Sequence, residues 1–411
     1  MVNKLTVLTG LSVLLAGIQP SIAQERIENI FDKEREDYKA DGVRLGAFEL
    51  KPSINISETY NDNIFAVETG QTSDMITNIR PGFELSSDWS NHELVFAASG
   101  DFGLYADNDD EDYQDYSVST DLRLDVLNET HVTAGASYDH LHEDRGSADD
   151  VNGKDPTEYD VTTGRVGLYR GLRKFSFSLD GVVSQYDYDD VSTSTGTIID
   201  NDDRDRDEYG FTAQVGYEIV PEYQAFIRYS ANKREYDQNA GTNRDSDGYE
   251  VVAGTAINLS GKARGEIYAG YIEQNYDNAA FRDIDGLSFG GNLLWNPTSL
   301  TSVNLNANRS IEETTTAGAS GYVATSYIAT VEHELRRNIL LGLDVSTTNN
   351  DYEGGSPSRE DDVSSVGLRG KYLFSRRIDV GVQYNYDERD SNIVGQDYHA
   401  NKLYLDFSFK L

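Results

Sequence analysis

The residues of this sequence that could do chemistry are mainly charged side chains, and they occur in two settings. In the first, they alternate with apolar residues, as in residues 122–126, which read Leu-Arg-Leu-Asp-Val. Alternation with period two indicates a β-strand, because successive side chains of a strand point to opposite faces. In the second, carboxylates form acidic runs, for example at residues 107–112 and 200–207. The first pattern predicts charged faces on strands, and the second predicts exposed loops.

The alternation places charges of both signs on one face of the predicted strands. If Val166 and Leu168 face outward, for example, Arg165 must face inward. A wall with such charges, separated by Ser, Thr, Asn and Gly, predicts a hydrated interior. The residues predicted to line this interior are Arg80, Glu84, Arg123, Asp125, Arg165, Arg228, Arg264, Glu266, Glu332, Asp344, Arg369 and Lys371.

These inward charges allow two interpretations, and the sequence alone leaves both open. In the first, Arg and Lys form rungs that guide an anionic polymer or solute, while carboxylates bind its hydroxyl groups. In the second, opposite charges on neighbouring strands pair with one another and simply satisfy a polar interior. Only the register between strands can separate the two interpretations.

Other chemistry finds little support in the sequence. Gly-x-Ser-x-Gly, His-Glu-x-x-His and phosphate-loop patterns are absent, so no catalytic residue is predicted and we expect no enzyme. His140 and His142 lie near a loop that contains Glu143, Asp144 and Asp149, where a metal or acid/base site is conceivable. An exposed pair is the favoured interpretation. The absence of Cys excludes disulfides and zinc–thiolate sites. We predict no resident metal and no cofactor.

The acidic runs at residues 107–112 and 200–207 could hold calcium or share divalent ions with lipopolysaccharide phosphates. Neither run has the glycine and the distant Glu of an EF-hand loop, so solvated loops are the favoured interpretation. The formal net charge is -36, from 71 acidic and 35 basic residues. A chain this acidic is not expected to bind nucleic acid.

The strand pattern repeats along most of the chain and predicts an all-β protein. The last residues place Leu403, Leu405, Phe407, Phe409 and Leu411 on one face, so a strand ends at the C-terminus. From about residue 46 onward, roughly eighteen such strands follow one another, and short turns alternate with long acidic loops. This regular alternation predicts a monomeric transmembrane antiparallel up-and-down β-barrel, with short periplasmic turns and long outer loops.

The N-terminal part differs from the repeat. Residues 1–23 have a basic start, a short apolar stretch and small residues before Gln24, which predicts a signal peptide. Residues 24–45 are highly charged, and we expect a periplasmic tail or partial plug with one or two helical turns. Residues 46–411 are predicted to form the barrel.

Tyrosines recur where the predicted strands meet the long loops. At a membrane boundary they would form an aromatic girdle, with rings against lipid and hydroxyls in water. The alternative is that Tyr simply favours strands. The residues predicted to form the girdle are Tyr60, Tyr138, Tyr186, Tyr188, Tyr236, Tyr276, Tyr352, Tyr384 and Tyr386.

Four short stretches resemble an outer-membrane β-barrel family known as “putative β-barrel porin 2”. They are GAFELKPSI at residues 46–54, ETYNDNIFA at 58–66, IRPGF at 79–83 and SDWSNH at 87–92. The Tyr-Asn-Asp-Asn-Ile-Phe stretch is the most specific, and its Asn and Asp residues are typical of a turn. Ile64 and Phe65 would then tuck the first outer loop inward or against the rim.

The resemblance implies a protein of the Gram-negative outer membrane that is associated with exopolysaccharide or capsule export. The barrel pattern itself predicts only passage. A general diffusion porin for small hydrophilic solutes and a non-transport structural or adhesive barrel remain alternatives. The expected partners are outer-membrane lipid and lipopolysaccharide, the barrel-assembly machinery, periplasmic polysaccharide export proteins, and an anionic or neutral polysaccharide.

Overall fold

The computed structural model describes residues 27–237, 243–259 and 261–411. The predicted signal peptide and residues 24–26 lie outside this range. The N-terminal half contains β1 (Val43–Leu45), β2 (Phe48–Asn61), β3 (Asp74–Ser87), β4 (His92–Tyr105), β5 (Tyr113–Leu127), β6 (Thr130–His142), β7 (Glu158–Leu172) and β8 (Phe175–Tyr188). A small hairpin of β9 (Val191–Ser192) and β10 (Ile198–Ile199) follows, and short 3-10 turns lie at η1 (Asp109–Glu111) and η2 (Asp202–Arg204).

The C-terminal half consists of long strands only: β11 (Arg206–Val220), β12 (Tyr223–Tyr236), β13 (Ser246–Leu259), β14 (Ala263–Tyr276), β15 (Ile284–Thr298), β16 (Thr301–Glu312), β17 (Ala319–Arg336), β18 (Ile339–Gly354), β19 (Glu360–Leu373), β20 (Ile378–Ser391) and β21 (Tyr398–Lys410). No helix in the described ranges has the length and apolar character needed to span a bilayer.

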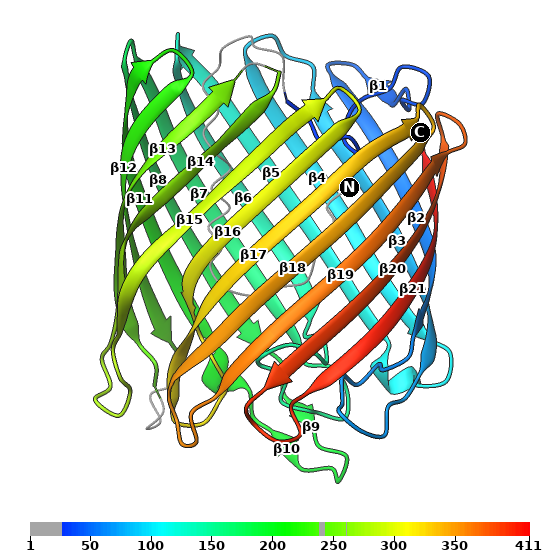
Figure 1. Cartoon of the computed structure of the whole chain (residues 1–411), viewed down its shortest axis with the longest axis vertical. Coiled ribbons are helices and arrows are strands. Elements are labelled where there is room, and N and C mark those ends of the chain that lie inside the picture. Colours follow the sequence, from blue (N-terminus) through cyan, green and yellow to red (C-terminus); the bar gives the residue numbers. More distant parts are fainter. Residues whose placement is uncertain (1–26, 238–242, 260) are drawn as a thin grey trace.

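These strands close into an antiparallel barrel of 18 strands (Figure 1). Each long strand pairs with the next one along the chain, and β8 pairs directly with β11. The barrel closes where β2 pairs with β21, from Ser53 opposite Lys410 to Asn61 opposite Lys402. The short strand β1 pairs only with the start of β2. The predicted fold class is therefore confirmed.

The two ends of the barrel differ in their connections, and we call them the turn end and the loop end. At the turn end the strands are joined by short turns, such as residues 128–129, 173–174 and 337–338, and the C-terminus lies there (Figure 1). At the loop end the connections are longer, and the longest are residues 143–157 and 189–205. A further loop at residues 277–283, between β14 and β15, was not predicted from the sequence.

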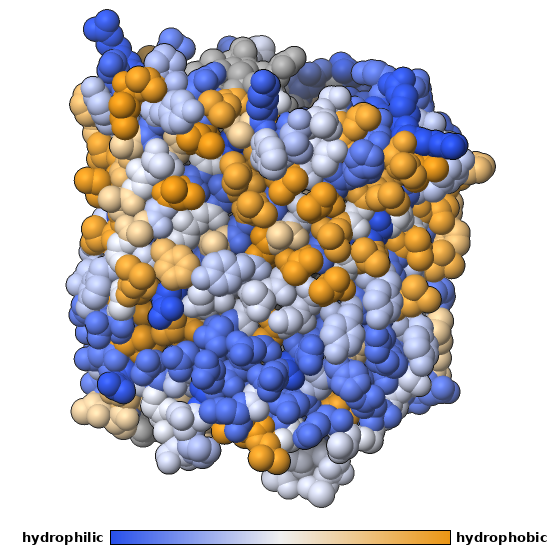
Figure 2. All heavy atoms as spheres, in the orientation of Figure 1, coloured by the Kyte–Doolittle hydropathy of each residue, from blue (hydrophilic) through white to orange (hydrophobic). Residues whose placement is uncertain are grey.

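The outer wall is apolar over most of its height. Exposed side chains on the outward face include Val166, Ile227 and Ile267, each more than 60% exposed. On the face shown in Figure 2, apolar side chains gather in the upper part of the wall, below the rim of the turn end, whereas the lower part, toward the loop end, is mostly hydrophilic. Burying this apolar band in hydrocarbon removes it from water, and a closed barrel leaves no unpaired strand edge there.

Residues 60–65, the most specific stretch of the family resemblance, lie where the first long strand of the barrel pairs with the last, and they contact the last strand. Asp62 accepts hydrogen bonds from the backbone N–H of Asn401 at 2.7 Å and from its side-chain amide at 2.8 Å. The side-chain amide of Asn63 donates to the carbonyl of His399 at 2.9 Å. The next residue, Ile64, is buried. These contacts tie the loop after β2 to the start of β21.

Candidate functional site

The inner wall is the candidate functional surface, and the strand register places every residue of the predicted lining set on it. Arg165, for example, pairs with Gly135, whereas its neighbour Val166 is 64% exposed on the outer wall. The same alternation puts the whole predicted set inside: Arg80, Glu84, Arg123, Asp125, Arg165, Arg228, Arg264, Glu266, Glu332, Asp344, Arg369 and Lys371. Their action on a solute remains a prediction.

Most of these charges are paired with a charge of opposite sign. The pairs join neighbouring strands or positions two residues apart, as expected for side chains on one face of a sheet. In two cases a long arginine side chain reaches across an intervening strand, from β12 to β14 and from β7 to β5. Register therefore favours the second interpretation of the sequence for much of the wall. Representative pairs are Arg80–Asp101 at 2.9 Å, Arg123–Asp125 at 3.0 Å, Arg228–Glu266 at 2.8 Å, Arg369–Asp344 at 2.6 Å, Lys371–Asp379 at 3.4 Å, Lys51–Glu84 at 3.7 Å, and Arg165–Asp121.

Glycines on the inner face let long side chains lie along the wall. A Cβ atom on Gly135 would lie 2.6 Å from Nε of Arg165, and one on Gly342 would lie 3.2 Å from Nε of Arg369. The absence of a side chain on these glycines gives the neighbouring guanidinium room to lie across the next strand. This arrangement keeps part of the lining close to the sheet.

One arc of the turn end is covered by residues 28–41, which we call the plug segment. Ile30 is 1% exposed and packs against Leu340 and Leu373 of the inner wall. The backbone N–H of Ile30 donates to Oγ of Ser302 at 3.0 Å. The backbone N–H of Lys33 donates to the carbonyl of Asn29 at 2.9 Å, and that of Tyr38 to the carbonyl of Arg35 at 2.8 Å, so the described residues of this segment form isolated turns without a regular helix. With only a few residues and no continuous apolar face, it takes its shape from the wall.

Polar contacts complete the docking of the plug segment. The guanidinium of Arg35 donates to Oε2 of Glu334 at 2.9 Å, and both side chains are buried. The backbone N–H of Phe31 donates to Oε2 of Glu332 at 3.0 Å, and its ring lies under the guanidinium of Arg369. The plug segment thus uses two residues of the predicted lining set, Glu332 and Arg369.

The loop end is crossed by residues 143–157, the connection between β6 and β7, which we call the lid loop. Arg145 donates through Nε to Oε2 of Glu111 at 2.7 Å, in the loop after β4. Glu143 accepts from Arg204 of η2, at 3.1 Å for one of the two contacts. These ion pairs connect the lid loop to loops on both sides of it.

Further contacts carry the lid loop across the mouth. The backbone N–H of Thr315, between β16 and β17, donates to Oδ1 of Asp149 at 3.0 Å. Strands β6 and β7 lie on nearly the opposite side of the ring from β16 and β17, so this contact spans the lumen. Gly146 lies against the hydroxyl of Tyr398, at the start of β21. The loop therefore reaches several parts of the rim.

The hairpin of β16 and β17 leans inward to meet the lid loop. Pairing between β15 and β16 ends at Gly290 and Asn308, so the last residues of β16 leave the wall. Ile311 and Val323, whose side chains would otherwise face outward, pack against Tyr276 and Ile284 on the inner face of the neighbouring strands. Residues 319–324 are consequently buried on both faces.

Burial shifts the titration of the lid loop. It raises the pKa of Glu143 even though the Arg204 guanidinium opposes the shift. Burial likewise raises the pKa of Asp149 and of Asp150, although nearby arginines lower both. The lid loop in this position therefore favours protonated carboxyl groups more than an open, hydrated loop would.

The predicted aromatic girdle is only partly correct. Tyr60, Tyr138 and Tyr384 are exposed on the outer wall, and Tyr386 lies on the same face. The other five face the lumen and are covered by loops or neighbouring strands: Tyr186, Tyr188, Tyr236, Tyr276 and Tyr352. Their position along the strand was visible in the sequence, but the face depends on the parity of each strand.

Arginines lie over two of these inward tyrosines. The guanidinium of Arg204 lies 3.9 Å from the ring centre of Tyr188, and that of Arg206 lies 4.2 Å from the ring centre of Tyr186. A guanidinium over an aromatic face gains cation–π attraction, which is strongest away from water. These tyrosines therefore contact the arginines at the loop end and help to hold the loops there.

The histidines and acidic runs do not form one site. His140 contacts Asp160 and His142 contacts Asp115, so each imidazole has its own carboxylate, and neither is fully exposed as the favoured interpretation expected. The second acidic run contributes Asp200 and Asp202, which with Asp190 form a group of exposed carboxylates.

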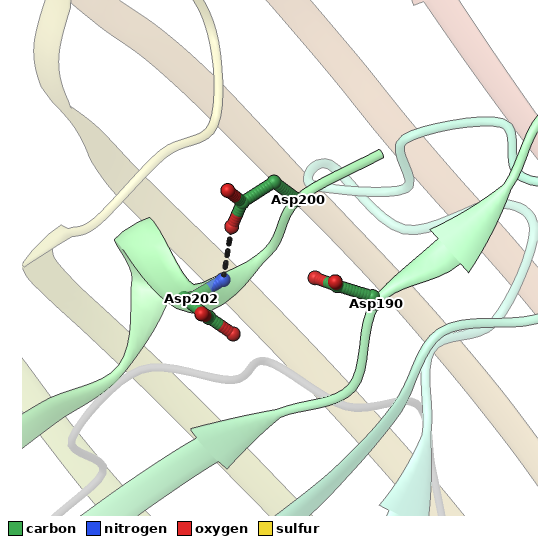
Figure 3. A group of neighbouring side chains, drawn as sticks. All are labelled: Asp190, Asp200 and Asp202. Atoms are coloured by element: carbon green, nitrogen blue, oxygen red, sulfur yellow. Dashed lines mark hydrogen bonds between the residues drawn. The ribbon is translucent and has the colours of Figure 1, made fainter. Parts of the chain in front are cut away.

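In this group, one carboxylate oxygen from each of Asp190, Asp200 and Asp202 lies within 4.8 Å of the others (Figure 3). Asp200 also accepts a hydrogen bond from the backbone N–H of Asp202 at 3.2 Å. Exposed acidic groups of this kind are common without an ion, and nothing else at this position indicates a ligand.

Comparison with protein families gives one match to most of the chain. The family model described as “Putative beta-barrel porin 2” matches residues 36–411. No curated protein matches the chain.

The chain is also similar to solved structures at low identity. OccK3 (OpdO) of Pseudomonas aeruginosa is 14% identical, with 93% of this chain and 100% of that chain covered and a TM-score of 0.45. OccAB4 of Acinetobacter baumannii is 10% identical, with 90% and 99% covered and a TM-score of 0.47. A mutant of the ferric enterobactin receptor PfeA of Pseudomonas aeruginosa is 8% identical, with 91% and 81% covered and a TM-score of 0.48.

Proposed function

The chain belongs to the family “Putative beta-barrel porin 2”, and from this premise we propose that it carries a polysaccharide out through the outer membrane. The protein is a porin-like β-barrel of the Gram-negative outer membrane. In such barrels the short turns face the periplasm and the long loops face the outside. The plug segment then lies at the periplasmic mouth and the lid loop at the outer mouth.

One observation carries the choice of a polymer over small solutes: a hydrophilic inner wall is crossed by a loop at one mouth and partly covered by a docked segment at the other. The lid loop crosses one mouth through ion pairs, and the plug segment docks on the wall of the other. A pore for general diffusion works best when it is permanently open. The plug segment and the lid loop suit a polymer that is delivered by partner proteins and displaces both of them.

Two other functions each have one supporting observation. Paired charges along the wall, such as Arg228 with Glu266, would also suit a porin for small hydrophilic solutes. The crossing of the mouth by the lid loop would suit a closed barrel with a structural or adhesive role at the cell surface. The polysaccharide channel accounts for both observations, because the wall supplies passage and the covers supply control.

Partners follow from the same proposal. Periplasmic polysaccharide export proteins would deliver the polymer to the plug segment, the barrel-assembly machinery would insert the strands, and lipopolysaccharide would surround the hydrophilic outer part of the wall. The inner wall presents paired charges for passage, and we expect no catalytic activity.

Planar-bilayer conductance of the refolded protein, with and without the producing organism's purified exopolysaccharide, tests this function. Steady or intermittent conductance that the polymer blocks at low concentration supports the polysaccharide channel. Conductance that is indifferent to the polymer supports a general porin. Absence of conductance, also after removal of residues 144–155 of the lid loop, supports a structural barrel.

A further inference from the structure

One strip of the inner wall differs from the rest because it carries amides in place of charges. Asn304, Asn306 and Asn308 follow one another on the inner face of β16, and Asn292 of β15 lies opposite Asn306. We call these four residues the amide track. Successive inward residues of a strand are about 7 Å apart, so the three on β16 form an evenly spaced ladder along the lumen.

The two strands that pair with β16 add no charge opposite its three amides. On β17 the inward residues opposite the track are Thr330, Ile328 and Ser326. On β15 the inward residue opposite Asn308 is Gly290. The inner face of β15 to β17 is therefore neutral beside these amides. On the β14 side, Glu266 lies opposite Asn292 and is paired with Arg228 at 2.8 Å.

The amides are also available for a ligand. Asn304 and Asn306 are exposed although they face the lumen, and their side chains make no hydrogen bond within the described ranges. Asn308 makes only a long contact with Ser310, at 3.4 Å. A free amide offers donors and an acceptor together, which matches the hydroxyl groups of a sugar.

An aromatic ring lies beside the track. Tyr268 of β14 lies across Gly290, where a Cβ atom would come within 2.4 Å of its hydroxyl oxygen. Gly290 pairs with Asn308, so the ring and the ladder are adjacent. Tyr268 is partly exposed. Tyr presents an apolar face and a polar tip, a combination that suits a sugar ring, which has both C–H and O–H groups.

The track runs between the two covers of the lumen. At one end, Ser302 of the same strand accepts the backbone N–H of Ile30 from the plug segment. At the other end, the strand leads to Glu313, whose carboxylate contacts Arg234 and Tyr236 beneath the loops. A chain that displaced both covers would pass along β16.

We infer that the amide track binds a neutral polyhydroxylated chain, that is, an uncharged glycan. This inference rests on the proposed function and narrows its substrate class. Amides bind hydroxyl groups without a charged partner, so a neutral sugar loses little on leaving water. An anionic chain would find no cation on the inner face of β15 to β17 beside the amides. It would meet the carboxylate of Glu266 beside Asn292, and those of Glu332 and Glu312 at the two ends of the track.

The test measures block of single-channel conductance by dextran oligosaccharides, which are neutral, and by oligogalacturonate, which is anionic. We expect dextran oligosaccharides to block at lower concentration. The double variant N304A/N306A removes the exposed amides and should weaken that block about tenfold, the loss expected for two hydrogen bonds. The matched control is N385A, because the amide oxygen of Asn385 already accepts from Gln383 at 2.9 Å and lies on another arc of the wall. It should change the block less than about twofold.

Two results would overturn the amide track while leaving a conducting channel intact. One is tighter block by oligogalacturonate than by dextran oligosaccharides. The other is unchanged block in N304A/N306A. A barrel that never conducts contradicts the proposed function itself. In that case, isothermal titration calorimetry of the refolded, full-length barrel with the same oligosaccharides tests whether the amide track binds a neutral glycan. Equal heats of binding for the wild type and N304A/N306A would refute this.

Discussion

At the loop end, the lid loop is held by ion pairs and hydrogen bonds to several other loops around the rim, including Glu111, Arg204 and Thr315. At the turn end, the plug segment lies along one arc of the wall, where Ile30 fills an apolar niche and Arg35 pairs with Glu334. Both covers lie over the same lumen, but different interactions hold them.

This difference predicts different triggers for the two covers. Buried ion pairs depend on the protonation and pairing of each member, so the lid loop should respond to pH and to removal of a single charge. An apolar contact depends mainly on the area it buries, so the plug segment should respond to a competing chain or to loss of Ile30. The predictions below separate the two covers, starting with the largest effect.

Removal of Arg204 should disturb the lid loop most. R204A leaves the buried carboxylate of Glu143 without its cation, which costs about 3–5 kcal/mol, less the part that Glu143 recovers by binding a proton. Faster hydrogen exchange in residues 143–157 and more frequent channel openings would report the change. The matched control is K154A, because Lys154 pairs with Asp110 while both side chains are exposed. Equal hydrogen exchange in the two variants would contradict the assignment of the Arg204–Glu143 ion pair as a contact that holds the lid loop in place.

Loss of the apolar anchor should release the plug segment. I30A removes most of a side chain that is 1% exposed, and such truncations cost about 2–5 kcal/mol. Protease cleavage within residues 28–41 should rise, while the melting temperature of the barrel stays the same because the strands do not depend on this segment. E34A is the control, since the Glu34 side chain is 64% exposed. If E34A raised protease cleavage as much as I30A does, the apolar contact of Ile30 would not be what holds the plug segment.

Acidification should favour the closed lid loop. Burial raises the pKa of Glu143, Asp149 and Asp150 in the closed position. The closed position therefore binds protons more tightly than an open one, in which these groups return to their ordinary pKa of about 4. Lowering the pH from neutral toward 4 should reduce conductance, and raising it again should restore conductance. Conductance that increases as the pH falls would contradict this sign.

The exposed ion pairs of the plug segment should matter least. Arg337 and Asp37 lie 3.3 Å apart, but their side chains are 71% and 62% exposed. Such pairs contribute roughly 0–1 kcal/mol and are screened by salt. R337A should therefore leave protease cleavage of residues 28–41 within about twofold of the wild type. A release as large as that of I30A would mean that charge, and not the apolar niche, holds the plug segment.

Much of the barrel could be predicted from local sequence pattern. The alternation of Val166 and Leu168 with Arg165 already assigns a face to each residue, because the side-chain period of a strand is two. The short and long connections set the two ends of the barrel. The same rule, applied to the alternation within β8, places Tyr188 on the inner face. The girdle prediction was wrong for five of its nine tyrosines because it used their position along the strand alone.

The covers of the lumen could not be predicted in the same way. Residues 143–157 read as a long acidic loop, and only the fold brings Asp149 to Thr315 on the far side of the ring. One local sign was present, since Arg145 lies among carboxylates, but its partner Glu111 is 34 residues away. The plug segment was expected as a tail or partial plug, yet its seat on Leu340 and Leu373 depends on strands that lie late in the chain.

The sequence by itself determined the strands, their two faces and the order in which they pair, because these follow from a period of two and from short connections between neighbours. Only the tertiary structure decided which charges pair across the wall, which amides remain free on β16, and which segments cover the mouths. Those features depend on contacts between residues far apart in the chain, and closure of β2 against β21 brings them together.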